Sequence, residues 1–247
     1  MIRRMTEEYL KSLKPDSEAA VKLLALAEAY GLDSSFVRFW EGEEGMAASL
    51  MDDVLTMLSS NSSWEETALF VSMQPEIRSL RTSGAAEELA RLLPGWELET
   101  GRVMEPNRKF IPFHSVSQPS PQMLYPVLTA CFPGSMPPFD VWYADVHHRL
   151  RRGLCRLAAV MTKDGAAACA MTTAECRGGG VIGAVATLPT YRGRGYASAC
   201  VSNLAASLQG EGRRVYLSPK NDRARQLYAG LGFSVCGEWS TLKRPIE

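Results

Sequence analysis

Two glycines and two arginines alternate in one short stretch, Tyr191-Arg-Gly-Arg-Gly-Tyr-Ala197. An apolar run with a proline precedes it, and a long run of apolar and small residues at helical spacing follows it. The first turn of a helix carries backbone N–H groups without partners, and the helix dipole adds positive charge there. Glycine lets a ligand approach such groups closely and permits a positive φ. The stretch therefore predicts an anion site that suits a phosphate-bearing cofactor.

A second patterned stretch, NDRARQLYAGLGF, runs from Asn221 to Phe233. Together, the two stretches resemble the signatures of the GNAT N-acetyltransferase superfamily. The first signature, R/Q-x-x-G-x-G/A, is matched by Arg192, Gly195 and Ala197. The second, N-x-x-A-x-x-x-Y-x-x-x-G-F, is matched by Asn221, Ala224, Tyr228, Gly232 and Phe233. The resemblance covers residues from roughly 110 to 245.

The resemblance implies acetyl-CoA as cosubstrate, a primary amine as acceptor, and no metal. It also implies a fold in which the fourth strand separates from the fifth, so that the pantetheine arm of the cofactor lies in the gap. Backbone groups of Val185, Ala186 and Thr187 would contact that arm, and Asn221 would face it. The pyrophosphate would be cradled by Arg192, Gly193, Arg194, Gly195, Tyr196 and Ala197.

The resemblance places Tyr228 near the thioester sulfur. A phenol hydroxyl, with an ordinary pKa of about 10, can protonate the departing thiolate. The alternative is that Tyr228 only packs on its helix beside Leu227 and Leu231. The attacking amine must also lose a proton, and Glu175, at the end of a predicted strand, is the candidate base. Its alternative is an exposed charge at a strand end.

One predicted helix carries further polar residues that could border the acceptor. Asp140, Asp145, His147 and His148 are weaker candidates for that pocket, and a solvated surface is the alternative for each. The arginines that follow are expected to form a solvated basic face, with an acidic acceptor or the ribose phosphate of the cofactor as the alternative ligand; they are Arg149, Arg151, Arg152 and Arg156.

These features predict an N-acetyltransferase that acts on a small-molecule amine by direct attack on the thioester. A CoA-binding sensor or scaffold without turnover is the main alternative. A P-loop nucleotide-binding protein is disfavoured, because no Lys-Ser/Thr pair follows the glycines.

The composition excludes several classes of protein. Lysine plus arginine equals aspartate plus glutamate at 27 each, so no global basic field recruits nucleic acid. The six cysteines show no CxxC spacing, which disfavours zinc and a disulfide framework. No signal-peptide pattern and no membrane-spanning run is evident. We expect a cytoplasmic protein without membrane or nucleic-acid partners; a homodimer is one option that the sequence leaves open.

The residue patterns predict an α/β fold with a mixed, mostly antiparallel sheet and flanking helices. Residues 106–247 are predicted to form the acetyltransferase domain, with the element order βααβββαβαββ. Its helices are expected at 122–131, 139–151, 196–210 and 222–231, and its strands at 109–113, 155–162, 166–175, 181–188, 215–217, 233–236 and 239–242.

Residues 1–105 are predicted to form a smaller α/β region. Helices are expected at 16–30, 46–58 and 84–93, and strands at 67–73 and 96–103. The strand, helix and turn within 67–96 loosely echo residues 215–233. This echo suggests a degenerate half-copy of the same fold, without a second glycine turn.

Overall fold

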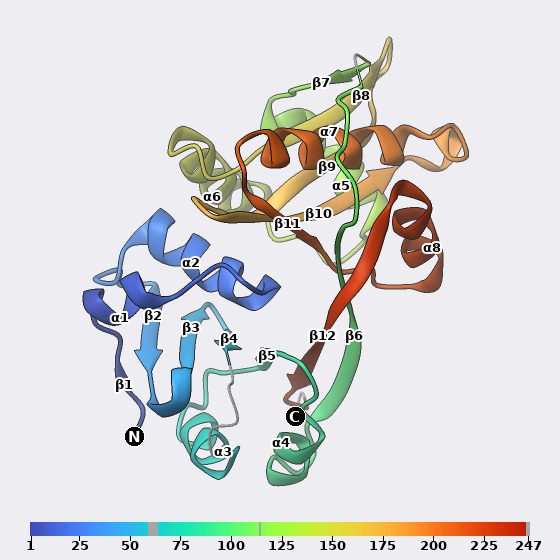
Figure 1. Ribbon diagram of the computed structural model, residues 1–247. Helices are drawn as coiled ribbons and strands as arrows, with labels where there is room; N and C mark the ends of the chain where they lie inside the picture. The colour runs from blue at the N-terminus through green and yellow to red at the C-terminus, as the bar shows by residue number, and fades with distance from the viewer. Residues whose placement is uncertain (59–63, 114, 246–247) are drawn as a thin grey trace. The chain divides into compact units, whose positions relative to one another are not determined.

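The computed structural model describes residues 1–58, 64–113 and 115–245 of the 247-residue chain (Figure 1). Contacts divide the chain into two compact units. The first consists of Met1–Val103 together with Val235–Glu247, and the second of Met104–Ser234. The predicted domains, 1–105 and 106–247, stay a prediction, and they differ from this division mainly in the assignment of the last residues.

The first unit contains a mixed sheet with helices on both faces. In chain order its elements are β1 (Arg3–Arg4), α1 (Glu7–Ser12), α2 (Glu18–Tyr30), β2 (Val37–Glu41), β3 (Ala47–Met51), β4 (Val54–Leu58), α3 (Trp64–Ser72), β5 (Ser79–Ser83), α4 (Glu87–Leu92) and β6 (Glu97–Pro106). A short 3-10 turn, Glu43–Gly45, joins β2 to β3.

The second half of the chain repeats this order, although most of its last strand belongs to the first unit. Its elements are β7 (Val116–Ser117), α5 (Pro121–Cys131), α6 (Phe139–Arg151), β8 (Leu157–Thr162), β9 (Gly165–Cys176), β10 (Gly179–Thr187), α7 (Tyr196–Gly210), β11 (Arg214–Leu217), α8 (Asp222–Leu231) and β12 (Phe233–Lys243). A 3-10 turn, Pro189–Tyr191, lies between β10 and α7.

The pairing of the strands repeats as well. β2, β3 and β4 form an antiparallel meander, and β4 then pairs in parallel with β5. β8, β9 and β10 form the same meander, and β10 pairs in parallel with β11. The chain therefore contains two topological copies of one α/β pattern. This includes the short strands β1 and β7, which pair with β2 and β8.

The final strand of each copy pairs with the other copy. β12 runs antiparallel to β5, with Trp239 opposite Ser83 and Lys243 opposite Ser79. β6 reaches β11 in the same way, through Met104 opposite Leu217. β6 and β12 are neighbours in the sheet, and Figure 1 draws them side by side.

Helices cover both faces of the sheet in the second unit. On one face α7 packs through Cys200, Leu204 and Leu208 in a cluster that includes Ile182. On the other face, α5 and α6 belong to a second cluster that includes Leu124, Leu128, Val146, Cys169 and Ala186. The strands between these layers are apolar on both sides, so β9 is buried along most of its length.

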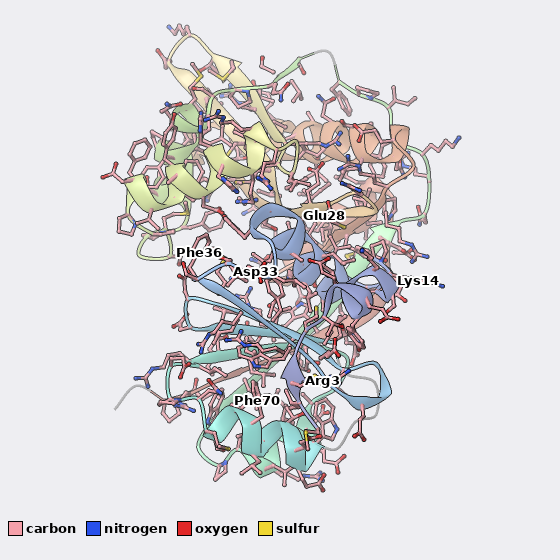
Figure 2. The ribbon with its side chains drawn as sticks, turned by 90° about the vertical axis from the view of Figure 1, so that its left-hand side faces the viewer. Arg3, Lys14, Glu28, Asp33, Phe36 and Phe70 are labelled. Carbon is pink, nitrogen blue, oxygen red and sulfur yellow. The ribbon has the colours of Figure 1, made fainter. Side chains whose placement is uncertain are left out.

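The first unit is built in the same layered way. α2 shares one apolar cluster with β2 and β3, through Leu23, Phe39 and Ala47. α3 and α4 lie with the opposite cluster, in which Phe70, labelled in Figure 2, meets the ring of Trp40 edge-on at 5.3 Å between centroids.

The predicted fold class is confirmed: the sheets are mixed, mostly antiparallel, and flanked by helices. The second-unit helices and the meander lie where they were predicted, within two residues at most ends. The segment 109–113 is not a strand. The two predicted terminal strands form one, β12.

Two predictions in the first unit are wrong. Residues 46–58 form the hairpin β3–β4 and not a helix, because Asp52 adopts a left-handed turn at φ 54° and reverses the chain. Residues 67–72 lie in helix α3 and not in a strand, since Thr67, Ala68 and Val71 form one buried face while Leu69 is exposed. In the first copy the strand that corresponds to β11 is β5, and not residues 67–73. A repeat therefore exists, but the predicted alignment of its residues is wrong.

Candidate functional site

The glycine turn has the backbone geometry that an anion site needs. Gly193 and Gly195 both have positive φ, 78° and 77°. Gly195 is the N-cap of the 15-residue helix α7, and no side chain caps this helix start. A Cβ on either glycine would meet nothing within 4 Å, so the left-handed backbone, and not space, requires glycine here. The first N–H groups of α7 therefore remain available to a ligand.

The two arginines of the turn are exposed. Arg192 donates from Nε to the carbonyl of Thr187 at 3.1 Å. Arg194 lies over the ring of Tyr191 at 5.4 Å and donates to the carbonyl of Thr190. Both guanidinium groups are held beside the uncapped helix start by contacts that a charged ligand can replace.

Strand β10 leaves its parallel neighbour before it reaches this turn. Its pairs with β11 run only from Gly179 to Ile182, although the strand continues to Thr187. Its pairing with β9 shifts register between Gly183 and Ala186, and Ala184 within this bulge has φ 50°. A bulge takes backbone groups out of the ladder and re-aims them. The end of β10 thus combines an open edge with a bulge.

The open edge leads directly to the glycine turn. Leu188 donates its N–H to Ala167 of β9. Because adjacent strand residues present their backbone groups to opposite sides, those of Thr187 face away from β9. The carbonyl of Thr187 accepts the Cys131 thiol, at 3.5 Å, as well as Arg192. In the strand register Ala186 lies opposite Cys169 and Thr187 opposite Ala168. Of these two predicted strand residues, Thr187 is the one whose backbone groups face away from β9.

One polar atom beside this edge lacks a partner. The hydroxyl oxygen of Thr187 is buried, and the described residues offer it no hydrogen bond. A buried hydroxyl without a partner costs free energy, unless a ligand or water supplies the bond. This orphaned atom, the open strand edge and the uncapped turn all fit an elongated ligand that has amide groups along its length and a phosphate at its end.

Tyr228 lies on α8 with its side chain in the cluster beneath α7. It is 7% exposed and meets Phe233 edge-on at 6.2 Å between ring centroids. Burial raises the pKa of Tyr228 to about 12, and no acidic or basic neighbour contributes to this shift. The hydroxyl therefore stays protonated at neutral pH and acts as a donor.

Asn221 caps helix α8. Its Oδ1 accepts the N–H of Ala224 at 2.9 Å, which is the structural alternative considered for this residue. The side-chain amide nitrogen is not used in that bond, so the cap does not exclude a contact with a ligand.

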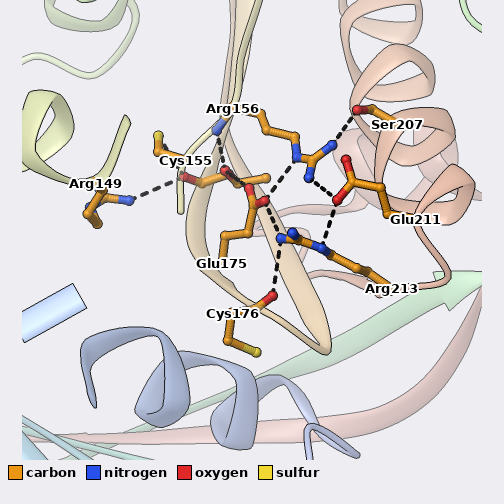
Figure 3. Close-up of polar contacts among 9 residues, drawn as sticks. Arg149, Cys155, Arg156, Glu175, Cys176, Ser207, Glu211 and Arg213 are labelled. Carbon is orange, nitrogen blue, oxygen red and sulfur yellow. Dashed lines mark hydrogen bonds and ion pairs between the residues drawn. The ribbon is translucent and has the colours of Figure 1, made fainter. Parts of the chain in front are cut away.

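Glu175 is fully buried at the centre of an ion-pair network (Figure 3). Its Oε1 accepts from Arg156 at 2.9 Å and from Arg213 at 2.6 Å. Its Oε2 accepts from the hydroxyl of Thr172 at 2.9 Å. Both arginines also bind Glu211, which closes the ring. Its strand partner is Gly180, and the β10 bulge begins three residues further along β10. These contacts argue against a base role for Glu175.

Several side chains occupy other places than the sequence suggested. Arg149 is buried rather than solvated, and it binds Asp145. Arg156 belongs to the network around Glu175. His147 is exposed and stacks on Tyr143, with 5.4 Å between ring centroids. Sequence patterns did not point to Ala184 or Cys131, because neither an alanine in a strand nor a single cysteine has a distinctive pattern.

No metal or membrane feature accompanies this site. Residues 1–58, 64–113 and 115–245 contain no group of His, Cys, Asp and Glu side chains arranged to hold a metal ion. Over the same ranges, no helix combines the length and apolarity needed to cross a bilayer.

Comparison with known proteins identifies the architecture. Residues 151–241 match the family model of FR47-like proteins. A search of curated proteins found no match. Among solved structures, a GCN5-related N-acetyltransferase from Sphaerobacter thermophilus aligns with a TM-score of 0.62 at 17% identity, covering 99% of this chain and 96% of its own.

Two further structures align over nearly their whole length. An acetyltransferase of the GNAT family from Colwellia psychrerythraea aligns with a TM-score of 0.58 at 14% identity, covering 99% of this chain and 100% of its own. A tandem GNAT protein from the clavulanic acid biosynthesis pathway, described as being without AcCoA, aligns with a TM-score of 0.58 at 12% identity. It covers 100% of this chain and 99% of its own.

The fold and the site define a two-copy α/β protein with one strand edge that opens onto a glycine turn. The chain has the fold of solved structures described as GNAT-family acetyltransferases, and its residues 151–241 match the FR47-like family model.

Proposed function

We propose that the chain is an N-acetyltransferase that moves an acetyl group from acetyl-CoA to a primary amine of a small molecule. One observation carries this proposal: the free edge of β10 runs into an uncapped, positive-φ glycine turn at the start of α7. The arm of CoA carries amide groups that pair with such an edge. Its pyrophosphate suits the helix start, where backbone N–H groups and two arginines converge.

The bulge of β10 supplies a means to stabilise the reaction. When an amine attacks the thioester, negative charge develops on the carbonyl oxygen. The residues in the register shift, Ala184 and Val185, carry backbone N–H groups that are free of regular pairing with β9. A fixed N–H donor near that oxygen favours the transition state over the ground state.

Tyr228 is the proposed acid. Its hydroxyl keeps its proton because burial raises its pKa to about 12. A protonated phenol in an apolar cluster can donate to the departing CoA thiolate. Holding the two reactants together accounts for a further part of the acceleration. Glu175 as the base stays a prediction, and its ion pairs favour a structural role.

The test of the proposal has two stages. Titration calorimetry with acetyl-CoA first measures binding, and a screen of amines then measures free thiol release. Binding with thiol release supports the transferase. Binding without release over the whole panel supports the alternative function, a CoA sensor or scaffold, which the locked Glu175 favours. No binding at millimolar acetyl-CoA excludes both.

We expect Tyr228→Phe to lower kcat while the Kd for acetyl-CoA stays within about twofold, since general acid catalysis contributes roughly a hundredfold or more. Tyr216→Phe is the matched control, because Tyr216 is also buried in this unit but its hydroxyl already accepts from Arg214 at 3.2 Å. Equal kcat values for the two variants would remove Tyr228 from the mechanism.

A further inference from the structure

Helix α6 carries a buried charge that the proposed chemistry does not use. Arg149 is 8% exposed and binds Asp145 one turn earlier through Nε, at 3.1 Å to each carboxylate oxygen, and through Nη2, at 2.6 Å. The fork of the guanidinium group thus fixes its orientation on the helix. The remaining nitrogen, Nη1, points away from this pair toward β9 (Figure 3).

Nη1 of Arg149 binds a β-bulge in β9. In β9, Ala174 pairs with Val181 and Thr172 pairs with Ile182, so Thr173 is the extra residue of a bulge. Nη1 of Arg149 donates to the carbonyls of Thr172 and Thr173, at 3.4 and 3.3 Å. Bulge carbonyls lose regular ladder partners, and a buried cation that binds two of them holds the bulge in one conformation.

The bulge of β9 in turn contacts β10. The hydroxyl of Thr173 donates to the carbonyl of Val181 at 3.3 Å. A Cβ on Gly183 would lie 2.7 Å from the methyl group of Thr173, so this side chain sits directly against the backbone of Gly183. Gly183 is the last paired residue before Ala184, whose φ is 50°. A continuous set of contacts therefore joins Arg149 to the β10 bulge.

We propose that Arg149, oriented by Asp145, is a positioning residue that sets the β10 bulge through Thr173, and thereby aims the N–H groups that receive the acyl carbonyl. This inference rests on the proposed function. It assigns a role to the Arg149–Asp145 pair of α6. It predicts that loss of Arg149 weakens the hydrogen bonds to the acetyl carbonyl, while the affinity for the rest of CoA is unchanged. The hydrogen bonds of Arg149 described above go to Asp145 on α6 and to Thr172 and Thr173 on β9, and not to the glycine turn.

The experiment measures the carbonyl directly and needs no acceptor amine. The infrared stretch of acetyl-CoA labelled with carbon-13 at its carbonyl reports hydrogen bonds to that oxygen. The variants are Arg149→Met, Arg149→Lys and Thr173→Ala, with Arg151→Met, which changes an exposed arginine on the same helix, as the control. Calorimetry with CoA, which lacks the acetyl group, measures the rest of the site in each protein.

We expect the wild type and Arg151→Met to shift the stretch to lower frequency on binding. Arg149→Met is expected to lose most of the shift while its Kd for CoA stays within about twofold, and Arg149→Lys to recover part of it because the charge is retained. Once an acceptor amine has been identified, kcat of Arg149→Met should fall by about ten- to a hundredfold at a nearly constant KM for acetyl-CoA.

The outcomes separate the two ideas. If the wild type binds no CoA, the proposed function fails and this inference fails with it. If the wild type binds and Arg149→Met keeps the wild-type stretch, the inference alone is overturned. If Arg149→Met does not fold, Thr173→Ala is the deciding variant. Thr173 is exposed, so the change is tolerated, and it removes both the bond to Val181 and the methyl group against Gly183. A carbonyl stretch that no longer shifts on binding then supports the inference, and a wild-type stretch overturns it.

Discussion

Glycine at positions 193 and 195 is required by the backbone and not by the space around it. Both residues lie in the left-handed region, and a Cβ on either would contact nothing within 4 Å. For other residue types this conformation costs about 1–2 kcal/mol. A substitution should therefore move the turn rather than break the core, and its effect should appear in the binding of the pyrophosphate.

We predict that Gly195→Ala weakens acetyl-CoA binding roughly tenfold, as a cost of about 1–2 kcal/mol implies. Titration calorimetry measures the change. Gly210→Ala is the control, because this glycine ends α7 without a positive φ and also has open space around it. If both substitutions leave the Kd unchanged, the turn does not hold the ligand.

The sequence singled out the glycine turn and Tyr228 because glycine and tyrosine recur there at fixed offsets that a helix start and a helix face impose. Their roles in the site stay predictions. The burial of Arg149 and the left-handed Ala184 were not found. An arginine looks the same in a sequence whether or not a carboxylate one turn away allows it to be buried, and a bulge in an alanine-rich strand has no signature of its own.

At the scale of elements, the network around Glu175 joins strands to a helix. Arg156 precedes β8, Glu175 lies near the end of β9, and Arg213 precedes β11. Ser207 and Glu211, at the end of α7, bind Arg156 as well. The hydrogen bond from Arg156 holds the pKa of Glu211 below its usual value. A buried carboxylate between two arginines ties these elements together.

Removal of the charge at position 175 should therefore affect stability. We predict that Glu175→Gln lowers the free energy of unfolding by about 3–5 kcal/mol, because two arginines lose a buried counter-ion. Glu211→Gln, at a half-exposed position, should cost about 1 kcal/mol or less. Urea unfolding measures both. If Glu175→Gln is as stable as the wild type but loses thiol release, Glu175 is the base and the structural role is wrong.

A second buried carboxylate joins β1, α1 and β2 in the first unit. Glu41 is 2% exposed and accepts from the N–H and hydroxyl of Thr6 and from Arg3. The hydrogen bond from the Thr6 N–H, followed by those from its hydroxyl and from Arg3, lowers the pKa of Glu41. A carboxyl whose pKa is lower in the folded state stabilises the fold above its unfolded pKa of about 4.5, and this contribution is lost as the pH falls through the folded value.

We predict that Glu41→Gln destabilises the protein by about 1–3 kcal/mol at pH 7, and that the difference from the wild type shrinks as the pH is lowered below 4.5. Urea unfolding at a series of pH values measures this trend. Glu8→Gln, at an exposed position on α1, should change the free energy by less than about 0.5 kcal/mol. If the difference in unfolding free energy grows toward low pH, the pKa of Glu41 is not lowered in the folded protein.

Most elements were predictable from their residue patterns, and two in the first unit were not. α6 was placed correctly because polar residues mark its outer side. The segment Met46–Leu50 is buried without interruption, so its periodicity could not distinguish a helix from a strand. In α3, β-branched and aromatic residues favoured a strand, but packing of one helical face against its own core decided otherwise.

At the scale of the whole molecule, the repeat explains why only one site is expected. In the second copy β10 has a register shift and outruns its pairs with β11. In the first copy the equivalent strand β4 pairs without a shift with β3, and with β5 over Val54–Met57. A regular strand with both edges paired leaves no gap for an extended ligand. The two copies therefore share a topology, and among the residues that the structure describes only the second copy has the irregular strand that the proposed chemistry needs.

The exchange of final strands makes the stability of one copy depend on residues from the other end of the chain. Leu242 of β12 is fully buried in the apolar cluster formed by β2–β5, α3 and α4. We predict that Leu242→Ala lowers the free energy of unfolding by about 2–5 kcal/mol. Because β12 pairs with β5, hydrogen exchange should rise first in β5 and α4. Val235→Ala, at an exposed position near the start of the same strand, is the control. If exchange rises only within β12, the strand is peripheral and the exchanged pairing does not hold the first unit together.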